Sequence, residues 1–290
     1  RYGFKGPLFT VDAACASAAH SIGYAFNLIR AGLVEIAVTG GADSPFSRGV
    51  VEAWCCLRAL SERNDDPAHA CRPFSADRDG MALGEGAGVL VLESEESALR
   101  RGQPILAEVR GYGASSDGHH ITQPTPEGPA RAMRRALKDA GLALDEVDAI
   151  NAHATGTLWN DKVETAAIKD VFGERAYDLP IVGNKAALGH SIGGSGALEL
   201  ISAVLTLRDQ ILPPTINYTT PDPECDLDYV TEGARSVRAR HILSNSFAVG
   251  GSNAARGVGR RETGDGGPGR PGTGDRGRET GDVGRETVAP

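Results

Sequence analysis

Short apolar runs alternate with amphipathic segments along most of the chain, and this alternation constrains the fold more than any other feature. A short apolar run suits a buried strand, whereas apolar positions three and four apart suit a helix. Strands are expected near residues 8–11, 36–38, 89–92, 106–109, 147–150, 181–182 and 242–247. Helices are expected near residues 16–31, 94–101, 127–140, 161–172 and 195–207, with Asp161 as an N-cap. Strands interleaved with helices predict a layered α/β protein up to about residue 253.

The composition changes in the last part of the chain. Residues 257–290 hold 11 of the 38 glycines and contain Arg-Glu-Thr-Gly-Asp twice, at 261–265 and 278–282. Few large apolar side chains are available there to offset the entropy of ordering. Residues 257–290 are therefore predicted to form a disordered tail.

Charge, hydropathy and cysteine content exclude several classes of function. The net charge of -8 argues against a nucleic-acid partner, which would require a basic face. No apolar run approaches the roughly 20 residues needed to cross a bilayer. The cysteines are odd in number and include no Cys-x-x-Cys pair, so they fit neither a disulfide framework nor a zinc site. Free cysteines predict a reducing, cytoplasmic location. They are Cys15, Cys55, Cys56, Cys71 and Cys225.

Cys15 stands where a predicted short strand runs directly into a long helix. Its surroundings at 11–18, Val-Asp-Ala-Ala-Cys-Ala-Ser-Ala, are small residues. A helix N-terminus favours the thiolate form of a cysteine, which is the nucleophilic form. Small neighbours would admit a substrate and leave the Cys15 amide free as an oxyanion donor. A cysteine before a helix is, however, often only a buried structural residue.

Two histidines and a lysine lie in loops that follow predicted strands. His153, in Asn-Ala-His-Ala-Thr-Gly-Thr at 151–157, follows the C-terminal end of a strand, where ligands gather in α/β sheets. Lys185 and His190 lie in a glycine-rich loop, 183–196, that leads into an apolar helix. A lone loop histidine often only completes local hydrogen bonding. The loop is not a Walker phosphate-binding loop, because Lys185 precedes its glycines.

A fourth motif, Asn-Ser-Phe-Ala-Val-Gly-Gly-Ser-Asn at 245–253, opens a strand into a Gly-Gly turn whose amides could face a cavity. Alone it could be any tight turn. Together, the order and spacing of the four motifs resemble those of the elongating, type II β-ketoacyl-acyl-carrier-protein synthases of the thiolase-like superfamily. The likeness extends to Arg-Pro-Phe at 72–74, Asp-Arg-Asp-Gly at 77–80, Leu-Gly-Glu-Gly-Ala-Gly at 83–88 and Ser-Ser-Asp at 115–117.

The resemblance implies a decarboxylative Claisen condensation of an acyl thioester with malonyl-acyl carrier protein, in fatty-acid or polyketide elongation. Cys15 would be the nucleophile that carries the acyl chain. His153 and His190 would stabilise the enolate as neutral donors. Lys185 would support the histidines, and Glu199 would pair with Lys185.

The resemblance also implies roles around the thiol. The amides of Cys15 and Phe247 would form the oxyanion hole, and the Phe247 ring would gate access to the sulfur. Thr155 and Thr157 would contact the phosphopantetheine arm, and Arg58 the carrier protein. No metal and no redox cofactor is implied, because the substrates arrive on the phosphopantetheine of acyl carrier protein.

The implied fold is a thiolase-like layered α/β/α/β/α fold. Residues 1–100 would be the remnant of an N-terminal half with the nucleophile, and residues 101–256 a C-terminal half with both histidines. Family members have well over a hundred residues before the nucleophile, so most of the first pseudo-repeat is predicted to be missing. Apolar faces would then be exposed, at about 25 cal/mol per Å², and the chain is expected to fold poorly as it stands. A homodimer, or a heterodimer with a related subunit, is expected, with residues 36–39 at its interface.

The chain departs from the family pattern at three places. Ala154 and Ala248 stand where glycines are usual, at a cost of about 1 kcal/mol each if φ is positive there. Residues 255–259, Ala-Arg-Gly-Val-Gly, stand where an apolar last strand is expected, so that strand is predicted to be broken.

Several alternative functions remain beside the elongating synthase. Initiating and chalcone-type enzymes carry asparagine in place of His190, and degradative thiolases a second cysteine where residues 250–251 are glycines, so both are disfavoured. A non-catalytic, chain-length-factor-like subunit or an inactive truncated remnant is the main alternative, although the silent subunit usually lacks the cysteine. A nucleotide site at 84–88 is weak, because those glycines precede a strand.

Overall fold

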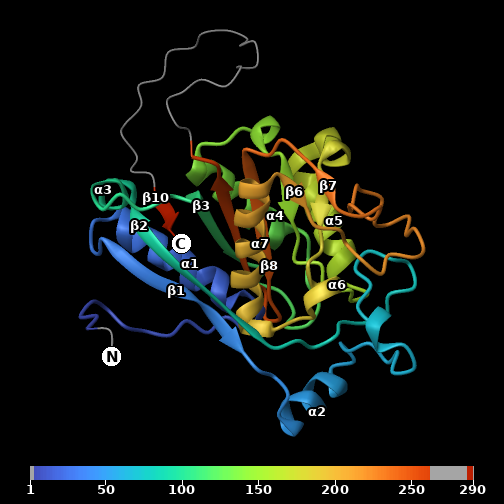
Figure 1. Cartoon of the computed structure of the whole chain (residues 1–290). Helices are drawn as coiled ribbons and strands as arrows, with labels where there is room; N and C mark the ends of the chain where they lie inside the picture. Colours follow the sequence, from blue (N-terminus) through green and yellow to red (C-terminus); the bar gives the residue numbers. More distant parts are fainter. Residues whose placement is uncertain (1–2, 262–285, 290) are drawn as a thin grey trace.

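The computed structural model describes residues 3–261 and 286–289, which form an α/β protein around one large mixed sheet (Figure 1). β4 runs parallel to β8 and β5, and every other neighbouring pair in this sheet is antiparallel. The strand order is β1 (Ile36–Asp43), β2 (Gly86–Ser94), β10 (Glu286–Ala289), β3 (Ala107–Ser116), β9 (Ser252–Gly259), β8 (His241–Phe247), β4 (Ala149–Asn151) and β5 (Ile181–Val182). A small second sheet joins β6 (Ile211–Leu212) to β7 (Arg235–Ser236).

Helices lie in two layers against the large sheet. α1 and α7 contact β1 and β2 on one side and β8 or β9 on the other, whereas α4 packs on β3 and β9 from the opposite face. The α-helices are α1 (Ser17–Arg30), α2 (Arg48–Cys56), α3 (Glu95–Arg100), α4 (Glu127–Ala140), α5 (Asn160–Phe172), α6 (Lys185–Leu188) and α7 (Ser195–Asp209). The 3-10 helices are η1 (Ala14–Ala16), η2 (Pro67–His69), η3 (Leu144–Glu146), η4 (Gly173–Asp178) and η5 (Ile192–Gly194).

α4 shows how the local sequence fixes the packing. Its predicted bounds are confirmed, Met133 and Leu137 are buried, and Gly141 ends it with a φ of 64°. Glycines on the facing strand let the helix approach closely. A Cβ at Gly113 would lie 2.1 Å from the Ala132 carbonyl oxygen, and one at Gly111 would lie 2.5 Å from that of Ala136. The helix can therefore rest directly on the β3 backbone.

Several predicted elements are confirmed, but the predicted strand at residues 8–11 and the predicted N-cap role of Asp161 are wrong. No strand forms at residues 8–11, where Leu8 is 98% exposed, so Cys15 follows an extended segment rather than a strand. Asp161 is not an N-cap: α5 begins at Asn160, and the buried Asp161 carboxylate instead accepts from the amides of Phe74, at 2.8 Å, and Gly156, at 3.2 Å. The carboxylate thus holds two loops rather than the end of its own helix.

The predicted break at residues 255–259 is also wrong. β9 runs unbroken to Gly259 between β8 and β3, and its residues from Asn253 to Gly259 are buried. A central position supplies ladder bonds on both edges, which offsets the weak strand propensity of glycine. The predicted disordered tail is therefore wrong for residues 257–259, and also for β10, which pairs with β2 and β3. Residues 262–285 and 290 of that tail lie outside the described residues.

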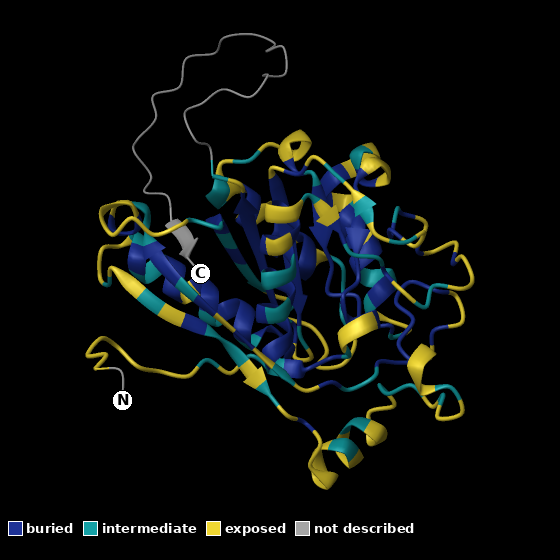
Figure 2. Cartoon of the chain, in the orientation of Figure 1, coloured by how far each residue is buried: buried dark blue, intermediate teal, exposed yellow. Residues whose placement is uncertain are grey.

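The β1–β2 end of the sheet has an open outer face (Figure 2). Val38 is 54% exposed and Val89 is 63% exposed, although both belong to strands. α2 projects from the body next to β1 and has no buried residue. Among the described helices, none combines the length and the apolar content that a bilayer crossing requires.

Candidate active site

Cys15 lies in η1, which runs directly into α1, and the residue is 4% exposed. Ala14 adopts a positive φ of 48°, which turns the backbone sharply into the helix. The sequence predicted that the helix N-terminus would favour the thiolate. The pKa of Cys15 is instead raised to about 11, because burial outweighs the opposing effects of Lys185 and the Val249 amide. The Cys15 thiol is therefore neutral at rest.

His153 follows β4 in a loop that two buried groups hold. Its amide donates to Glu164 Oε1 at 2.8 Å, and its carbonyl accepts from the Lys185 ammonium. Lys185 Nζ also lies 3.2 Å from His153 Nδ1. Because an ammonium can only donate, Nδ1 is the acceptor and the proton of the neutral ring is assigned to Nε2. Nε2–H of His153 is thus a donor for the site.

His190 follows α6 and is fully buried. Its Nδ1 lies 2.9 Å from Ser195 Oγ, at the start of α7, whereas its Nε2 has no hydrogen-bond partner within the described part of the chain. A buried donor without a partner is costly, and such atoms in native proteins are often reserved for a ligand. A Ser195 hydroxyl that donates to Nδ1 leaves the His190 proton on Nε2.

Both imidazoles are held neutral. Burial, followed by the charge of Lys185, lowers the pKa of each ring well below its ordinary value. The ring centroids lie 5.4 Å apart at an interplanar angle of 83°. Two neutral N–H donors can therefore point at one oxygen without repelling each other as imidazolium ions would.

The thiol and the two rings converge. The potential ligand atoms of Cys15, His153 and His190 all lie within 4.8 Å of one another, and all three residues line a cavity of about 420 Å³. This is also the set of described residues with the spacing of a metal site, and its donor types suit zinc. The proton assigned to His153 Nε2 opposes such coordination. The prediction that the site uses no metal stays a prediction.

Lys185 and Glu199 lie behind the cavity wall. Their side chains form a buried ion pair, with relative exposures of 2% each. Burial raises the pKa of Glu199, while the neighbouring Lys185 and, more weakly, Arg256 oppose that rise. The pair predicted from the sequence is therefore present, one layer behind the two histidines.

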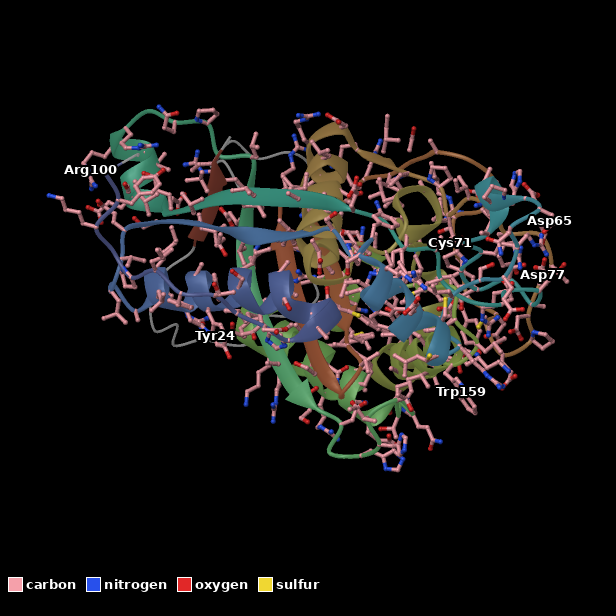
Figure 3. All side chains as sticks on the ribbon, turned by 90° about the horizontal axis from the view of Figure 1, so that it is seen from below. Tyr24, Asp65, Cys71, Asp77, Arg100 and Trp159 are labelled. Carbon is pink, nitrogen blue, oxygen red and sulfur yellow. The ribbon has the colours of Figure 1, made fainter. Side chains whose placement is uncertain are left out.

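The predicted pantetheine and carrier residues line the same cavity; Thr155 is buried, whereas Arg58 and Trp159 belong to the exposed part of the lining, which we call the mouth. Thr155 and Thr157 contribute hydroxyls 2.8 Å apart, and Arg58 is exposed at the rim with a φ of 53°. Phe247 is buried between cavity and core, and its ring lies 5.9 Å from that of His153. Figure 3 shows Trp159, another residue of the mouth, at the opposite end of the molecule from Arg100 of α3.

The two alanines that replace glycines of the family pattern, Ala154 and Ala248, have different structural consequences. Ala154 has a φ of 46°, so alanine there is strained by about 1 kcal/mol relative to glycine. Ala248 is not among the residues with positive φ, and no such strain applies. The His153 loop keeps its shape because the Ala154 amide donates to Glu164 Oε2 at 2.9 Å.

Glu164, Asn245 and Arg256 were missed as site residues from the sequence. Burial raises the pKa of Glu164 to about 7, and its carboxylate holds the His153 loop, with Asn245 Nδ2 3.3 Å away. The sequence could have indicated Glu164 as a glutamate on the apolar side of the predicted 161–172 helix, and Arg256 as a single charge within an otherwise uncharged strand. Neither pattern reveals which residues these side chains contact in the fold.

Comparisons with known proteins agree with this geometry. Residues 1–98 match the family model "Beta-ketoacyl synthase, N-terminal domain", and residues 106–219 match "Beta-ketoacyl synthase, C-terminal domain". Nodulation protein E of Rhizobium meliloti is 48% identical over 252 residues, which cover 87% of this chain and 61% of that protein. The 3-oxoacyl-[acyl-carrier-protein] synthase 2 of Synechocystis is 46% identical over 253 residues, with the same two coverages.

A solved structure shows the same fold. It is described as a type II PKS acyl-carrier protein in complex with its ketosynthase bound to the hexaketide, and it matches with a TM-score of 0.87 at 35% identity. The match covers 90% of this chain and 64% of that one. The predicted thiolase-like α/β fold is thereby confirmed. The chain spans about 61% of the length of the curated relatives that it matches. The first family model contains Cys15 and the second contains both histidines, and the chain belongs to the β-ketoacyl synthase family.

Proposed function

We propose that this chain is the condensing subunit, or part of it, of a β-ketoacyl synthase that extends acyl chains in fatty-acid or polyketide synthesis. The observation that carries the proposal is the convergence of one thiol and two neutral imidazoles, within 4.8 Å, in a cavity of about 420 Å³. The thiol can hold an acyl group covalently, and the imidazoles can stabilise a developing oxyanion. Both abilities are needed for a decarboxylative condensation.

The first step transfers the acyl chain to Cys15. The sulfur attacks the thioester carbonyl of acyl-carrier protein, a new carbon–sulfur bond forms at Cys15, and the bond to the pantetheine sulfur breaks. Because the Cys15 thiol is protonated at rest, its proton balances the one that the departing pantetheine thiol takes up. Amides of Cys15 and Phe247 are proposed to stabilise the tetrahedral oxyanion, and the Phe247 ring to gate access.

The second step makes the carbon–carbon bond. The carbon–carboxylate bond of malonyl-carrier protein breaks, carbon dioxide leaves, and the electron pair forms an enolate. N–H donors of His153 and His190 stabilise the enolate oxygen. The enolate carbon attacks the Cys15 thioester, the carbon–sulfur bond breaks, and the released thiolate takes one proton from solvent. Lys185 and Glu199 are proposed to hold the two rings in place.

The substrates reach the cavity through its mouth. Thr155 and Thr157 are proposed to contact the phosphopantetheine arm, and the exposed Arg58 an acidic carrier protein. No further cofactor is proposed, since the chemistry of the thioesters is sufficient. The five free cysteines fit a cytoplasmic location. A dimer, either with a second copy or with a related subunit, is also proposed, with β1 at its interface.

The two family matches also support a two-part organisation. We propose that residues 1–100 carry the nucleophile half and that residues 101–256 carry the histidine half. In the structure β2 and β3, one from each part, both pair with β10.

Transfer of a labelled acyl group from an acyl-carrier thioester, followed by peptide mapping, tests the function. We expect label on the peptide that contains Cys15, none in the Cys15→Ala variant, and normal labelling in the Cys71→Ala control. Cys71 is buried with a similarly raised pKa, but it does not line the cavity. Subsequent addition of malonyl-carrier protein should release carbon dioxide and a β-ketoacyl product.

The same experiment separates the alternatives. Folded protein that takes no acyl label would contradict the enzyme and favour a non-catalytic, chain-length-factor-like subunit or an inactive remnant. Label on Cys15 without condensation would show a cysteine that accepts acyl groups but lacks a working decarboxylation site.

A further inference from the structure

Arg256 is a fully buried cation in the middle of β9. Its Nη1 donates to the Gly196 carbonyl of α7 at 2.9 Å, and its Nη2 donates to the hydroxyls of Ser244 and Ser246 of β8 at 2.9 and 3.0 Å. A guanidinium presents its donors in a rigid fork. Arg256 therefore joins the first turn of α7 to β8 at a fixed distance.

The elements that Arg256 joins are those that carry the site. Ser195, next to Gly196, holds His190, and Glu199, in the same turn, holds Lys185. On β8, Ser246 immediately precedes Phe247 of the cavity wall. A movement of α7 along β8 would therefore displace both supports of the histidines at once.

The contact between α7 and β8 at Gly196 is too close to admit a side chain. A Cβ at Gly196 would lie 2.9 Å from Ser246 Oγ and 3.1 Å from the Ala19 amide nitrogen of α1. The helix that begins after Cys15, the helix that supports the histidines and the strand that ends at Phe247 thus meet at the position that Arg256 bonds.

The charge of Arg256 is also poorly compensated by its own contacts. Within the described residues, no carboxylate lies within ion-pairing distance of it, and its Nε has no hydrogen-bond partner. Burying a charge under such conditions is expensive, and an apolar residue would be the cheaper choice for a central strand. The cost indicates a role beyond packing.

We propose that Arg256 is a positioning residue for the condensation: its fork fixes α7 against β8, and its charge acts with Lys185 on Glu199 behind the histidines. This inference rests on the proposed function, because it assigns the role of the buried guanidinium in that reaction. Lys185, Glu199 and Arg256 form what we call the buried ionic group, which contains two cations and one carboxylate. The excess positive charge lies behind the donors that would face the enolate.

His153 senses several ionisable groups besides Arg256. Those around it are Cys15 of η1, Glu164 of α5, Lys185 of α6, His190 of the loop after α6 and, behind Lys185, Glu199 of α7. Arg256 lowers the pKa of His153, after burial, Lys185 and His190. Loss of the Arg256 charge should therefore raise that pKa. Because the neutral ring is the active form, the acid limb of the rate profile should move to higher pH.

Two substitutions separate charge from geometry. Arg256→Met removes both, and we expect kcat to fall roughly tenfold with KM nearly unchanged, together with the shift of the acid limb. Arg256→Lys keeps the charge but loses the fork, so its pH profile should match the parent while kcat falls. Both are measured on the full native protein, with malonyl- and acyl-carrier substrates and with the His153 ring titration followed by NMR.

Val258→Ala is the matched control, because Val258 is fully buried in the same strand and carries no charge. It should lower stability without moving the pH profile or the His153 titration. An Arg256→Met variant that loses activity only in proportion to stability, as Val258→Ala does, would overturn the proposal. If Arg256→Met does not fold, an Arg256→Lys variant with parental kcat would overturn the positioning role.

The ring titration keeps the two proposals distinguishable. If the parent protein shows no condensation, the proposed function fails, yet a raised His153 midpoint in Arg256→Met would still support the electrostatic role of Arg256. If the parent condenses but neither variant changes rate or midpoint, the function stands and the inference fails.

Discussion

The cavity wall and the buried ionic group differ in what they offer to chemistry. Cys15, His153 and His190 present a thiol and ring nitrogens to one space. Lys185, Glu199 and Arg256 are just as buried, yet none of them lines the cavity. The cavity wall contains the groups that would touch substrate, whereas the ionic group is proposed to fix their orientation and protonation state.

This difference explains why the site has neutral donors in a charged surrounding. A buried imidazole next to an ammonium remains unprotonated, so it donates through one nitrogen and carries no charge that would need compensation. The cations lie behind the rings and do not line the cavity; in the proposed reaction they would favour an enolate without contacting it. Substitutions in the cavity wall and in the buried ionic group should therefore impair different properties of the protein.

The largest effect is expected in the cavity wall. His153→Ala or His190→Ala should lower the rate of malonyl decarboxylation by roughly 10³-fold, because each removes one positioned N–H donor. Acylation of Cys15 should persist in both. Carbon dioxide release and acyl labelling measure the two steps separately, and His69→Ala, at an exposed residue that does not line the cavity, is the control. Unchanged decarboxylation in both variants would show that the wall does not act as described.

The next effect concerns the stability of the ionic group. Glu199→Leu should lower the free energy of unfolding by about 3–5 kcal/mol, because it leaves the Lys185 charge buried without its partner. The double variant Lys185→Met with Glu199→Leu should recover most of that stability but not the activity. Denaturant unfolding measures the first result, and steady-state kinetics measure the second.

An exposed ion pair provides the control for this cycle. Arg48 and Glu52 form a pair one helical turn apart, with relative exposures of 91% and 61%. Glu52→Gln should change stability by less than about 0.5 kcal/mol. A double variant as unstable as Glu199→Leu alone would contradict the view that the buried charge, and not lost packing, sets the cost.

A smaller effect should distinguish Cys15 from the other thiols. Since its pKa is about 11, the alkylation rate of Cys15 by iodoacetamide should rise about tenfold per pH unit between pH 7 and 10, as the thiolate fraction grows. Cys71 has a similarly raised pKa but no cavity, so it should react far more slowly. Mass spectrometry of the modified peptides follows both residues in one sample. A plateau for Cys15 below pH 9 would contradict the neutral resting thiol.

The smallest effect is expected at the mouth. Arg58→Ala should raise KM for a carrier-bound substrate about threefold and leave kcat unchanged, because an exposed charge steers an acidic partner weakly. The difference should disappear in high salt. Arg48→Ala, an exposed change in α2 that does not line the cavity, should have no effect on KM. An effect on kcat would place Arg58 nearer to the chemistry than the structure does.

The sequence identified the four motifs because each joins an unusual residue to a strand or helix boundary. Cys15 before α1, His153 after β4 and Lys185 with His190 before α7 all stand at such boundaries, but each motif alone left a structural role open. Their order and spacing, through the resemblance to β-ketoacyl synthases, predicted one site, and the structure brings them together. The strand through residues 255–259 was predicted to be broken because its composition is poor in apolar residues. The strand forms despite its weak strand propensity, because it lies in the centre of the sheet and hydrogen-bonds to β3 and β8 on its two edges.

Local sequence determined the order of the elements, their periodicity and the identity of the reactive side chains, since these depend on neighbours along the chain. Tertiary structure decided the protonation states and the supports. The thiol is neutral because folding buries it, and a helix terminus in the sequence does not reveal that burial. Glu164 accepts a hydrogen bond from the His153 amide, and Arg256 lowers the pKa of His153. Glu164 lies 11 residues further along the chain and Arg256 lies on β9, so both reach the His153 loop only because the chain folds around it. Desolvation and long-range charge depend on the three-dimensional distribution of atoms, which no local pattern records.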